Sequence, residues 1–290
     1  MSEATTYRGA SAAAIQHHYD VSNEFYALWL DPGRTYSCAL WEDGADTLED
    51  AQARKLDYIA DGAGTNGAAR VLDVGCGWGS MLRRLVEHHG VQHAVGLTLS
   101  PAQHAVAAEV AGPRCDVRIE NWAEHDAGEP YDAIVSIGAF EHFADYGMTR
   151  ADRVDGYRQF FDRCREWLPP GGRLALQTNV KGNNVRLDRK AVRDLLFIVD
   201  RIFPNSEIPW ASEVIEASER RFDVVSVRND PDHYARTCGE WFERLVRNRE
   251  RAVALVGEEM VSDYERYLST SVGHFQNRHL GLLRVVFERR

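Results

Sequence analysis

The sequence predicts an α/β fold in which helices cover both faces of a mostly parallel sheet. Short apolar runs alternate with helical patterns along most of the chain, an arrangement typical of parallel sheets. A glycine-rich turn follows the first of these runs. No internal repeat or low-complexity linker divides the 290 residues. We therefore expect a helical cap over residues 1–62 and a core over residues 63–290, with a lid inserted at residues 181–212.

Two helices are expected before the core. Residues 12–30 carry an aromatic face at helical spacing and are followed by an Asp-Pro-Gly break. Thr47 predicts the start of the second helix, because Asp50 lies three residues further on and an apolar pattern continues through Ile59.

Seven strands are expected in the core. They are predicted at residues 70–73, 94–97, 117–119, 131–137, 173–178, 223–227 and 281–287. Helices are predicted at residues 80–89, 101–110, 152–168, 191–202 and 238–268. Because a long helical region precedes the last strand, that strand can close the sheet in antiparallel fashion.

Composition argues against several classes of function. The chain has 34 Lys and Arg against 44 Asp and Glu, a formal net charge of −10, which argues against nucleic-acid binding. Its five cysteines are widely spaced, so we expect neither a disulfide scaffold nor a metal site. The N-terminus lacks a signal-peptide pattern, and no apolar run is long enough for a membrane span. We expect a cytoplasmic protein without integral membrane association, and the composition leaves a homo-oligomer open.

The most informative local pattern is VLDVGCGWG at residues 71–79, a strand that runs into a glycine-rich turn and a helix. Gly75 and Gly77 allow close approach of a ligand to the backbone, and Gly79 allows close helix packing. The GxGxG spacing after Asp73 differs from the GxGxxG of dinucleotide-binding folds. It resembles the S-adenosylmethionine (SAM) site of Rossmann-like class I methyltransferases, where a carboxylate helps hold the amino-acid part of SAM.

Five further strings resemble the family of cyclopropane-fatty-acyl-phospholipid synthases and mycolic acid cyclopropane synthases. In family order they are HYDVSN at 18–23, TYSCA at 35–39, LTLS at 97–100, IGAFEHF at 137–143 and HYA at 233–235. The resemblance implies a SAM-dependent enzyme that releases S-adenosylhomocysteine (SAH), with the N-terminal cap over the SAM site. It implies that SAM is held by Tyr36, Ser37, Asp73, Gly75, Gly77, Thr98, Leu99, Gln103, Trp122 and Ala123.

Family members also hold a bicarbonate, which serves as the base in ring formation. The residues that correspond to its ligands are Cys38, Ile137, Glu141 and Tyr234, and a further family ligand is the histidine of a His-Thr pair. Gln177 precedes Thr178 in that place here. A glutamine can form hydrogen bonds but can neither take up a proton nor carry a positive charge.

Two hypotheses about the product follow. In the first, bicarbonate binds with Gln177 as a neutral ligand, and an unsaturated acyl chain becomes cyclopropanated. In the second, which the substitution favours, the site is altered and the enzyme adds a methyl group to an alkene, prenyl or indole-type carbon of a largely apolar small molecule in specialised metabolism. O- or N-methylation, and a SAM-binding protein without transfer chemistry, are the remaining alternatives.

Glu141, His142, Gln177 and Tyr234 are the candidate catalytic residues. Glu141 follows an apolar strand at its carboxyl end, where it can stabilise a developing cation or simply begin a helix. His142 or Glu141 would be the base for O- or N-methylation. The Tyr234 ring can face a cation or form part of an apolar wall.

Acceptor contacts are expected from the cap, the strand ends and the lid. The candidates are Tyr19, Cys38, Ile137, Phe197, Phe203 and Trp210, although the aromatic residues of the lid are equally consistent with helix packing. Residues 150–193 carry 11 cations and 5 anions. This excess predicts a solvated helix face, or a clamp for an acidic group of the substrate.

Overall fold

The computed structural model describes residue 9 and residues 21–42, 44, 47–204 and 206–290. Its centre is a seven-stranded sheet in the order β3-β2-β1-β4-β5-β7-β6. The strands are β1 (Arg70–Val74), β2 (His93–Thr98), β3 (Cys115–Ile119), β4 (Ala133–Ile137), β5 (Arg173–Lys181), β6 (Phe222–Asn229) and β7 (Leu280–Arg289). The first five strands pair in parallel, and β7 is inserted antiparallel between β5 and β6. The predicted mostly parallel α/β fold is confirmed.

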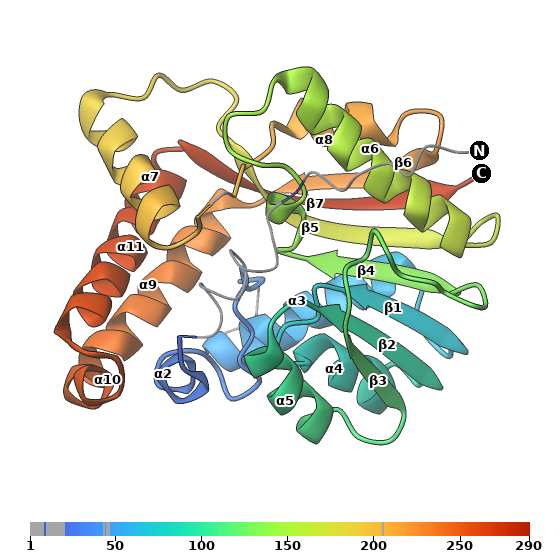
Figure 1. Ribbon diagram of the computed structural model, residues 1–290, viewed down its shortest axis with the longest axis horizontal. Coiled ribbons are helices and arrows are strands. Elements are labelled where there is room, and N and C mark those ends of the chain that lie inside the picture. The colour runs from blue at the N-terminus through green and yellow to red at the C-terminus, as the bar shows by residue number, and fades with distance from the viewer. Residues whose placement is uncertain (1–8, 10–20, 43, 45–46, 205) are drawn as a thin grey trace.

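Helices cover both faces of this sheet (Figure 1). On one face lie α3 (Leu48–Ala63), α4 (Ser80–His88) and α5 (Pro101–Val110), and on the other lie α6 (Arg150–Trp167) and α8 (Ala211–Ser218). Successive side chains of β1 point to opposite faces of the sheet: Val71 packs with α3 and α4, whereas Leu72 packs with α6. Because α3 contacts β4 and β5, part of the expected cap belongs to a layer of the core.

A third group of helices gathers at one end of the sheet, on the left of Figure 1. It contains α2 (Asn23–Ala27), α7 (Arg189–Arg201), α9 (Pro231–Arg247), α10 (Arg249–Val256) and α11 (Glu258–Gln276). Aromatic side chains hold this group together. The Phe25 and Tyr264 rings pack edge to face with their centroids 5.0 Å apart, and the Trp29 and Trp241 rings do so with their centroids 5.8 Å apart. This cluster closes the end of the sheet where β1, β2 and β4 finish.

Several predicted elements differ from the structure. The helix predicted at 12–30 falls partly on residues 10–20, which lie outside the described residues. In the described part, α2 begins at Asn23, where the Ser22 side chain accepts a hydrogen bond from the Phe25 backbone N–H. The helical region predicted at 238–268 is divided into α9, α10 and α11 by bends at Asn248 and Gly257.

Helix α8 was missed because it lacks an ordinary capping residue. Trp210 stands at its N-cap, and the Glu213 carboxylate accepts from the Trp210 backbone N–H at 3.1 Å. The start of α3 follows the prediction, since the Thr47 hydroxyl accepts from the Asp50 backbone N–H. None of the described helices is long and apolar enough to cross a membrane.

Candidate active site

Two cavities adjoin at the carboxyl ends of β1, β2 and β4. The first, here called the glycine-loop cavity, spans about 950 Å³ beside residues 75–77, with the open solvent at its mouth included. The second, here called the apolar cavity, spans about 940 Å³ by the same measure and lies beneath α7, α9 and α11. Four residues line both cavities and form the boundary between them: Tyr36, Ser37, Gly138 and His142. The carboxyl ends of parallel strands are the usual place for ligands in such folds.

The glycine loop lies against the ends of the neighbouring strands. The backbone N–H groups of Gly75 and Cys76 both donate to the Leu97 carbonyl, at 3.0 and 2.9 Å. Gly75 has φ +85°, and a Cβ atom placed there would lie 2.5 Å from the Cβ of Ala139. Only glycine therefore fits at this position, and the loop exposes backbone to the cavity.

Two buried titratable groups stand in the floor of the glycine-loop cavity. Burial raises the pKa of the Asp73 carboxyl to about 7, against the opposing effect of the Lys55 charge. Burial also lowers the pKa of Lys55 to about 7, and the nearby charge of Arg284 adds to this effect. The Lys55 ammonium donates to the Ser37 hydroxyl at 2.8 Å. Sequence reasoning missed Lys55, because a lysine on an amphipathic helix normally indicates a solvated face.

The far side of this cavity is made by the ends of β2 and β3. The Thr98 hydroxyl donates to the side-chain oxygen of Gln103 at 2.9 Å, and Leu99 stands beside them in the wall. Trp122 is buried and also lines the cavity, with its ring centroid 5.0 Å from that of Phe143.

One predicted residue is absent from this wall, and the wall contains an acidic residue that was not predicted. Ala123 does not line the cavity, because it packs against the core beneath while its backbone N–H donates to the Asn121 side chain. Glu120 does line it, one residue beyond β3. Its position could have been found from the rule that acidic residues at strand ends hold polar ligands, applied to the third strand.

The boundary between the cavities depends on residues 34–42, here called the strap. On its α3 side, the Gln52 amide donates to the carbonyl oxygens of Thr35 and Ser37, at 3.1 and 2.9 Å. On its α9 side, the Ala39 backbone N–H donates to the Thr237 hydroxyl at 3.2 Å.

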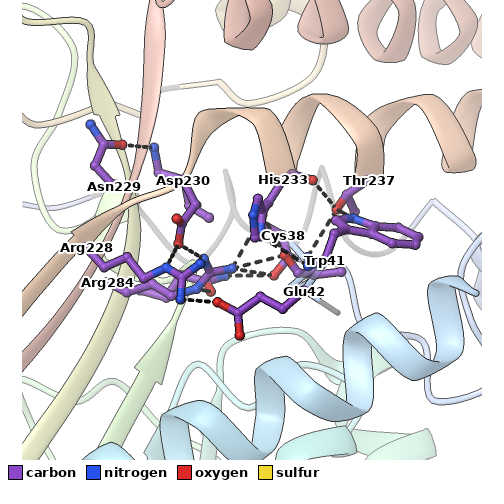
Figure 2. A network of polar contacts seen from close by, with 12 residues as sticks. Cys38, Trp41, Glu42, Arg228, Asn229, Asp230, His233, Thr237 and Arg284 are labelled. Carbon is purple, nitrogen blue, oxygen red and sulfur yellow. Dashed lines mark hydrogen bonds and ion pairs between the residues drawn. The ribbon is translucent and has the colours of Figure 1, made fainter. Parts of the chain in front are cut away.

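Trp41 adds two further bonds to this side of the strap. Its backbone N–H donates to His233 Nδ1 at 3.1 Å, and its indole N–H donates to Thr237 at 3.0 Å (Figure 2). The strap thus holds Tyr36, Ser37 and Cys38 in fixed positions.

The apolar cavity is walled mainly by hydrophobic side chains. They are Leu195, Ile198, Val199, Phe203, Ile208, Tyr234, Cys238, Tyr267, Phe275, Leu280 and Leu282. Cys38 also lines this cavity, whereas Ile137 lines the glycine-loop cavity.

The other expected acceptor contacts lie elsewhere. Phe197 does not line the cavity; it packs against α11, where the Arg266 guanidinium carbon lies 3.8 Å from the centroid of its ring. Trp210 is 36% exposed at the start of α8 and does not line the cavity. Tyr19 and the neighbouring His18 lie outside the described residues.

Glu141 reaches the apolar cavity from a tight turn. After β4, Gly138 has φ +70° and the 3-10 helix η1 (Phe140–His142) begins, which turns the Glu141 side chain into the wall. Its Oε1 accepts from the Asn179 backbone N–H at 2.7 Å. Its Oε2 is buried and has no hydrogen-bond partner among the residues described. Burial raises the pKa of this carboxyl.

His142 lines both cavities and contacts Ser206. Its Nδ1 lies 2.8 Å from the hydroxyl of Ser206, a residue of the predicted lid. Burial lowers the pKa of His142 to about 4, so the ring is neutral at pH 7.

Gln177 and Tyr234 complete the polar part of the apolar cavity. The Gln177 amino group lies 3.4 Å from the Cys38 carbonyl, and its amide oxygen accepts from Arg284 Nε at 2.8 Å. The Tyr234 ring stacks on Phe275 at 4.5 Å, and burial raises the pKa of its hydroxyl. The structure thus brings together all four predicted catalytic residues in one wall.

Many cations of residues 150–193 are engaged in ion pairs. Those with acidic partners are Arg150, Arg153, Arg158, Arg163, Arg173, Lys181 and Lys190. None of them lines either cavity. This placement supports the interpretation as a helix face and gives no support to a clamp for the substrate.

Comparisons with known proteins identify close relatives. A family described as mycolic acid cyclopropane synthetase matches residues 7–285. Cyclopropane mycolic acid synthase 2 of Mycobacterium leprae is 37% identical over 92% of this chain and 90% of its own. Hydroxymycolate synthase MmaA4 of Mycobacterium tuberculosis is 37% identical, over 92% and 89%. The crystal structure of mycolic acid cyclopropane synthase CmaA1 complexed with SAH and CTAB superposes with a TM-score of 0.88 at 34% identity, over 97% of this chain and 99% of that one.

Proposed function

Because this chain belongs to the mycolic acid cyclopropane synthetase family, we propose that it converts a double bond of an unsaturated acyl chain into a cyclopropane. The chain is a SAM-dependent enzyme, as its motifs predicted. One observation carries the proposal: the glycine-loop cavity adjoins, at Tyr36, Ser37, Gly138 and His142, a mainly apolar cavity whose lining suits a hydrocarbon chain. A relative crystallised with lipid-like CTAB supports the same class of acceptor.

This proposal replaces the preference that the sequence suggested. Gln177 favoured methylation without ring closure, but relatives named as cyclopropane synthases favour the ring. The chain's own wall also favours it, since Cys38, Glu141, Gln177 and Tyr234 all face the apolar cavity. These residues would hold bicarbonate, which supplies a proton acceptor when bound. The unpartnered Glu141 Oε2 fits a ligand that donates a hydrogen bond.

The residues of the glycine-loop cavity fit SAM. The exposed backbone at Gly75 and Gly77 admits a close ligand, and buried Asp73 offers a carboxylate to an ammonium group. Trp122 offers an aromatic face, and Thr98 with Gln103 offers polar contacts. SAM supplies an electrophilic methyl group on a sulfonium sulfur.

In the proposed reaction, the alkene π electrons form a bond to the methyl carbon while the carbon–sulfur bond breaks and its electron pair leaves with sulfur. A positive charge then develops on the other alkene carbon. The buried Glu141 carboxylate and the rings of Tyr36 and Tyr234 face this region and stabilise that charge. Transfer of a proton from the new methyl group to the base that bicarbonate would supply frees the C–H electron pair, which closes the ring. The apolar wall keeps water from capturing the cation.

Deuterated SAM tests this proposal. With a CD3-labelled methyl group and vesicles of dioleoylphosphatidylglycerol or oleoyl thioester as acceptor probes, we expect a product with two deuteriums and a cyclopropane signal in NMR. A product with three deuteriums would show methylation without ring closure. A methylene signal would show that the proton was lost without cyclisation. Absence of SAH binding in calorimetry would contradict the whole proposal.

A further inference from the structure

A buried arginine stands directly behind the wall that carries Gln177. Arg284 lies on β7, opposite Gln177 of β5 in the antiparallel register, and its side chain is only 1% exposed. Neither the motifs nor the family resemblance pointed to it. A guanidinium that is this deeply buried is costly unless its donors are satisfied.

Each nitrogen of the Arg284 guanidinium has an acceptor in the wall or behind it. Nε donates to the Gln177 side-chain oxygen at 2.8 Å, and Nη2 donates to the Ala39 carbonyl at 3.1 Å. The same Nη2 lies 3.6 Å from the Cys38 sulfur. On the opposite side, Nη1 pairs with Asp230. The cation therefore bridges the strap, β5 and the start of α9 (Figure 2).

This geometry fixes the orientation of the Gln177 amide. A guanidinium has donors and no acceptor, so the side of the amide that meets it must be the oxygen. The amino group of Gln177 must then turn toward the Cys38 carbonyl, at 3.4 Å, and the cavity. Gln177 is thereby held with its amino group as a donor toward the cavity, although an unrestrained glutamine could turn either its oxygen or its amino group that way.

We propose that Arg284 is a positioning residue that holds Gln177 as a hydrogen-bond donor and supplies the positive charge for an oxyanion bound between Gln177, Cys38 and Glu141. Bicarbonate is the anion that the proposed function requires, and this inference rests on that function. Gln177 lacks the charge that a histidine could carry. Arg284 supplies this positive charge from one hydrogen bond further away from the cavity. It acts through the Gln177 amide, which it polarises.

The surroundings leave this charge directed toward the cavity. Asp230 neutralises Arg284 from behind, and it also pairs with Arg228, which in turn pairs with Glu42 (Figure 2). These four charges sum to zero, but their arrangement places the guanidinium nearest to Cys38 and Gln177. The Lys55 ammonium approaches the strap from its α3 side, on the Ser37 hydroxyl. An anion at Cys38 would therefore lie beside the buried guanidinium of Arg284.

The test measures binding of ¹³C-labelled bicarbonate to the SAH complex by NMR, in wild-type protein and in R284Q, R284K and R228Q. We expect R284Q to weaken bicarbonate binding by at least about tenfold. R284K keeps the positive charge but loses the several donors of the planar guanidinium, so its affinity for bicarbonate should lie between those of R284Q and wild type. R228Q is the matched control: Arg228 shares Asp230 but contacts neither Gln177 nor Cys38, and affinity should stay within about twofold. In turnover, R284K should raise KM for bicarbonate while KM for SAM is unchanged.

The outcomes separate this inference from the proposed function. SAH affinity and circular dichroism report folding, and if R284Q does not fold, R284K decides the question. Wild-type affinity in a folded R284Q or in R284K would overturn the inference. A wild-type protein that makes cyclopropane but binds no bicarbonate would overturn it as well, while leaving the proposed function intact. If R228Q lost as much bicarbonate affinity as R284Q, the anion would depend on the charge cluster as a whole. That result would contradict the role assigned to Arg284.

Discussion

Substituting Gly75 by alanine should disrupt the contact between the glycine loop and the turn that carries Glu141. The new Cβ atom would lie 2.5 Å from the Cβ of Ala139, at a backbone φ of +85°. Left-handed backbone costs a non-glycine residue about 1–2 kcal/mol. Two methyl carbons normally stay about 3.5–4.0 Å apart, and forcing them apart in a packed site costs about 1–3 kcal/mol. We expect G75A to lower the free energy of unfolding by about 2–5 kcal/mol.

A matched glycine isolates the steric part of this cost. Gly64 has φ +72° at the end of α3, and a Cβ there would meet nothing within 4 Å. G64A should therefore lose only the backbone part, about 1–2 kcal/mol. Urea denaturation followed by circular dichroism measures both variants, and calorimetry measures SAH affinity. We expect G75A to bind SAH at least about tenfold more weakly, and G64A to bind it normally.

Removing the opposing methyl group should rescue the variant. In G75A/A139G the nearest remaining atom is the Ala139 Cα, at an ordinary 3.7 Å. A double-mutant cycle should therefore show a favourable coupling of about 1–3 kcal/mol. The reasoning is refuted if G75A and G64A are equally stable, or if the coupling is zero. If G75A is destabilised but binds SAH as tightly as wild type, the glycine loop is not the SAM contact.

Three further predictions concern single side chains of the two cavities. E141Q should keep the hydrogen bond from the Asn179 backbone N–H and bind SAH normally, but its kcat should be about 10²–10⁴-fold lower. In wild type, kcat should fall as the pH drops through the pKa of Glu141, which burial raises above its ordinary 4.5. W122A should lower the free energy of unfolding by about 3–5 kcal/mol, measured in urea, and weaken SAH binding. The Lys55 pKa of about 7 lies below that of the unfolded chain, so the unfolded state binds more protons above pH 7. The stability of wild type relative to K55M should therefore rise between about pH 7 and pH 10, and a flat difference would show that Lys55 stays charged.

Local signals were sufficient to predict most of the fold. The alternation of apolar strands and amphipathic helices reflects burial on two faces of one sheet, and Thr47 marks the start of α3 by its own side chain. Helix α8 was missed because Glu213, inside the helix, caps Trp210. The bend at Asn248 was missed because the apolar pattern continues across it.

Motifs predicted the residues at strand ends, but not those that act across the sheet. Glu141 and Gln177 stand at fixed offsets from apolar runs, so their positions follow from the fold. Arg284 reaches Gln177 only because β7 is inserted antiparallel beside β5, a register set by the whole sheet. Phe197 and Phe203 both looked suited to a pocket wall. The rotation of α7, which local spacing does not specify, keeps Phe197 out of the wall, whereas Phe203, just after the helix ends, lines the cavity.

The strap makes the two cavities depend on the C-terminal third of the chain. Tyr36 and Ser37 separate the cavities, yet the strap that carries them is bonded by Thr237, His233 and Arg284. Methyl transfer requires donor and acceptor in contact within a dry site, because small displacements slow such reactions greatly. Changes at His233, Thr237 or Arg284, none of which lines either cavity, should therefore alter the approach of the acceptor to SAM. In the proposed reaction, we therefore expect the C-terminal elements that hold the strap to set the distance across which the methyl group moves.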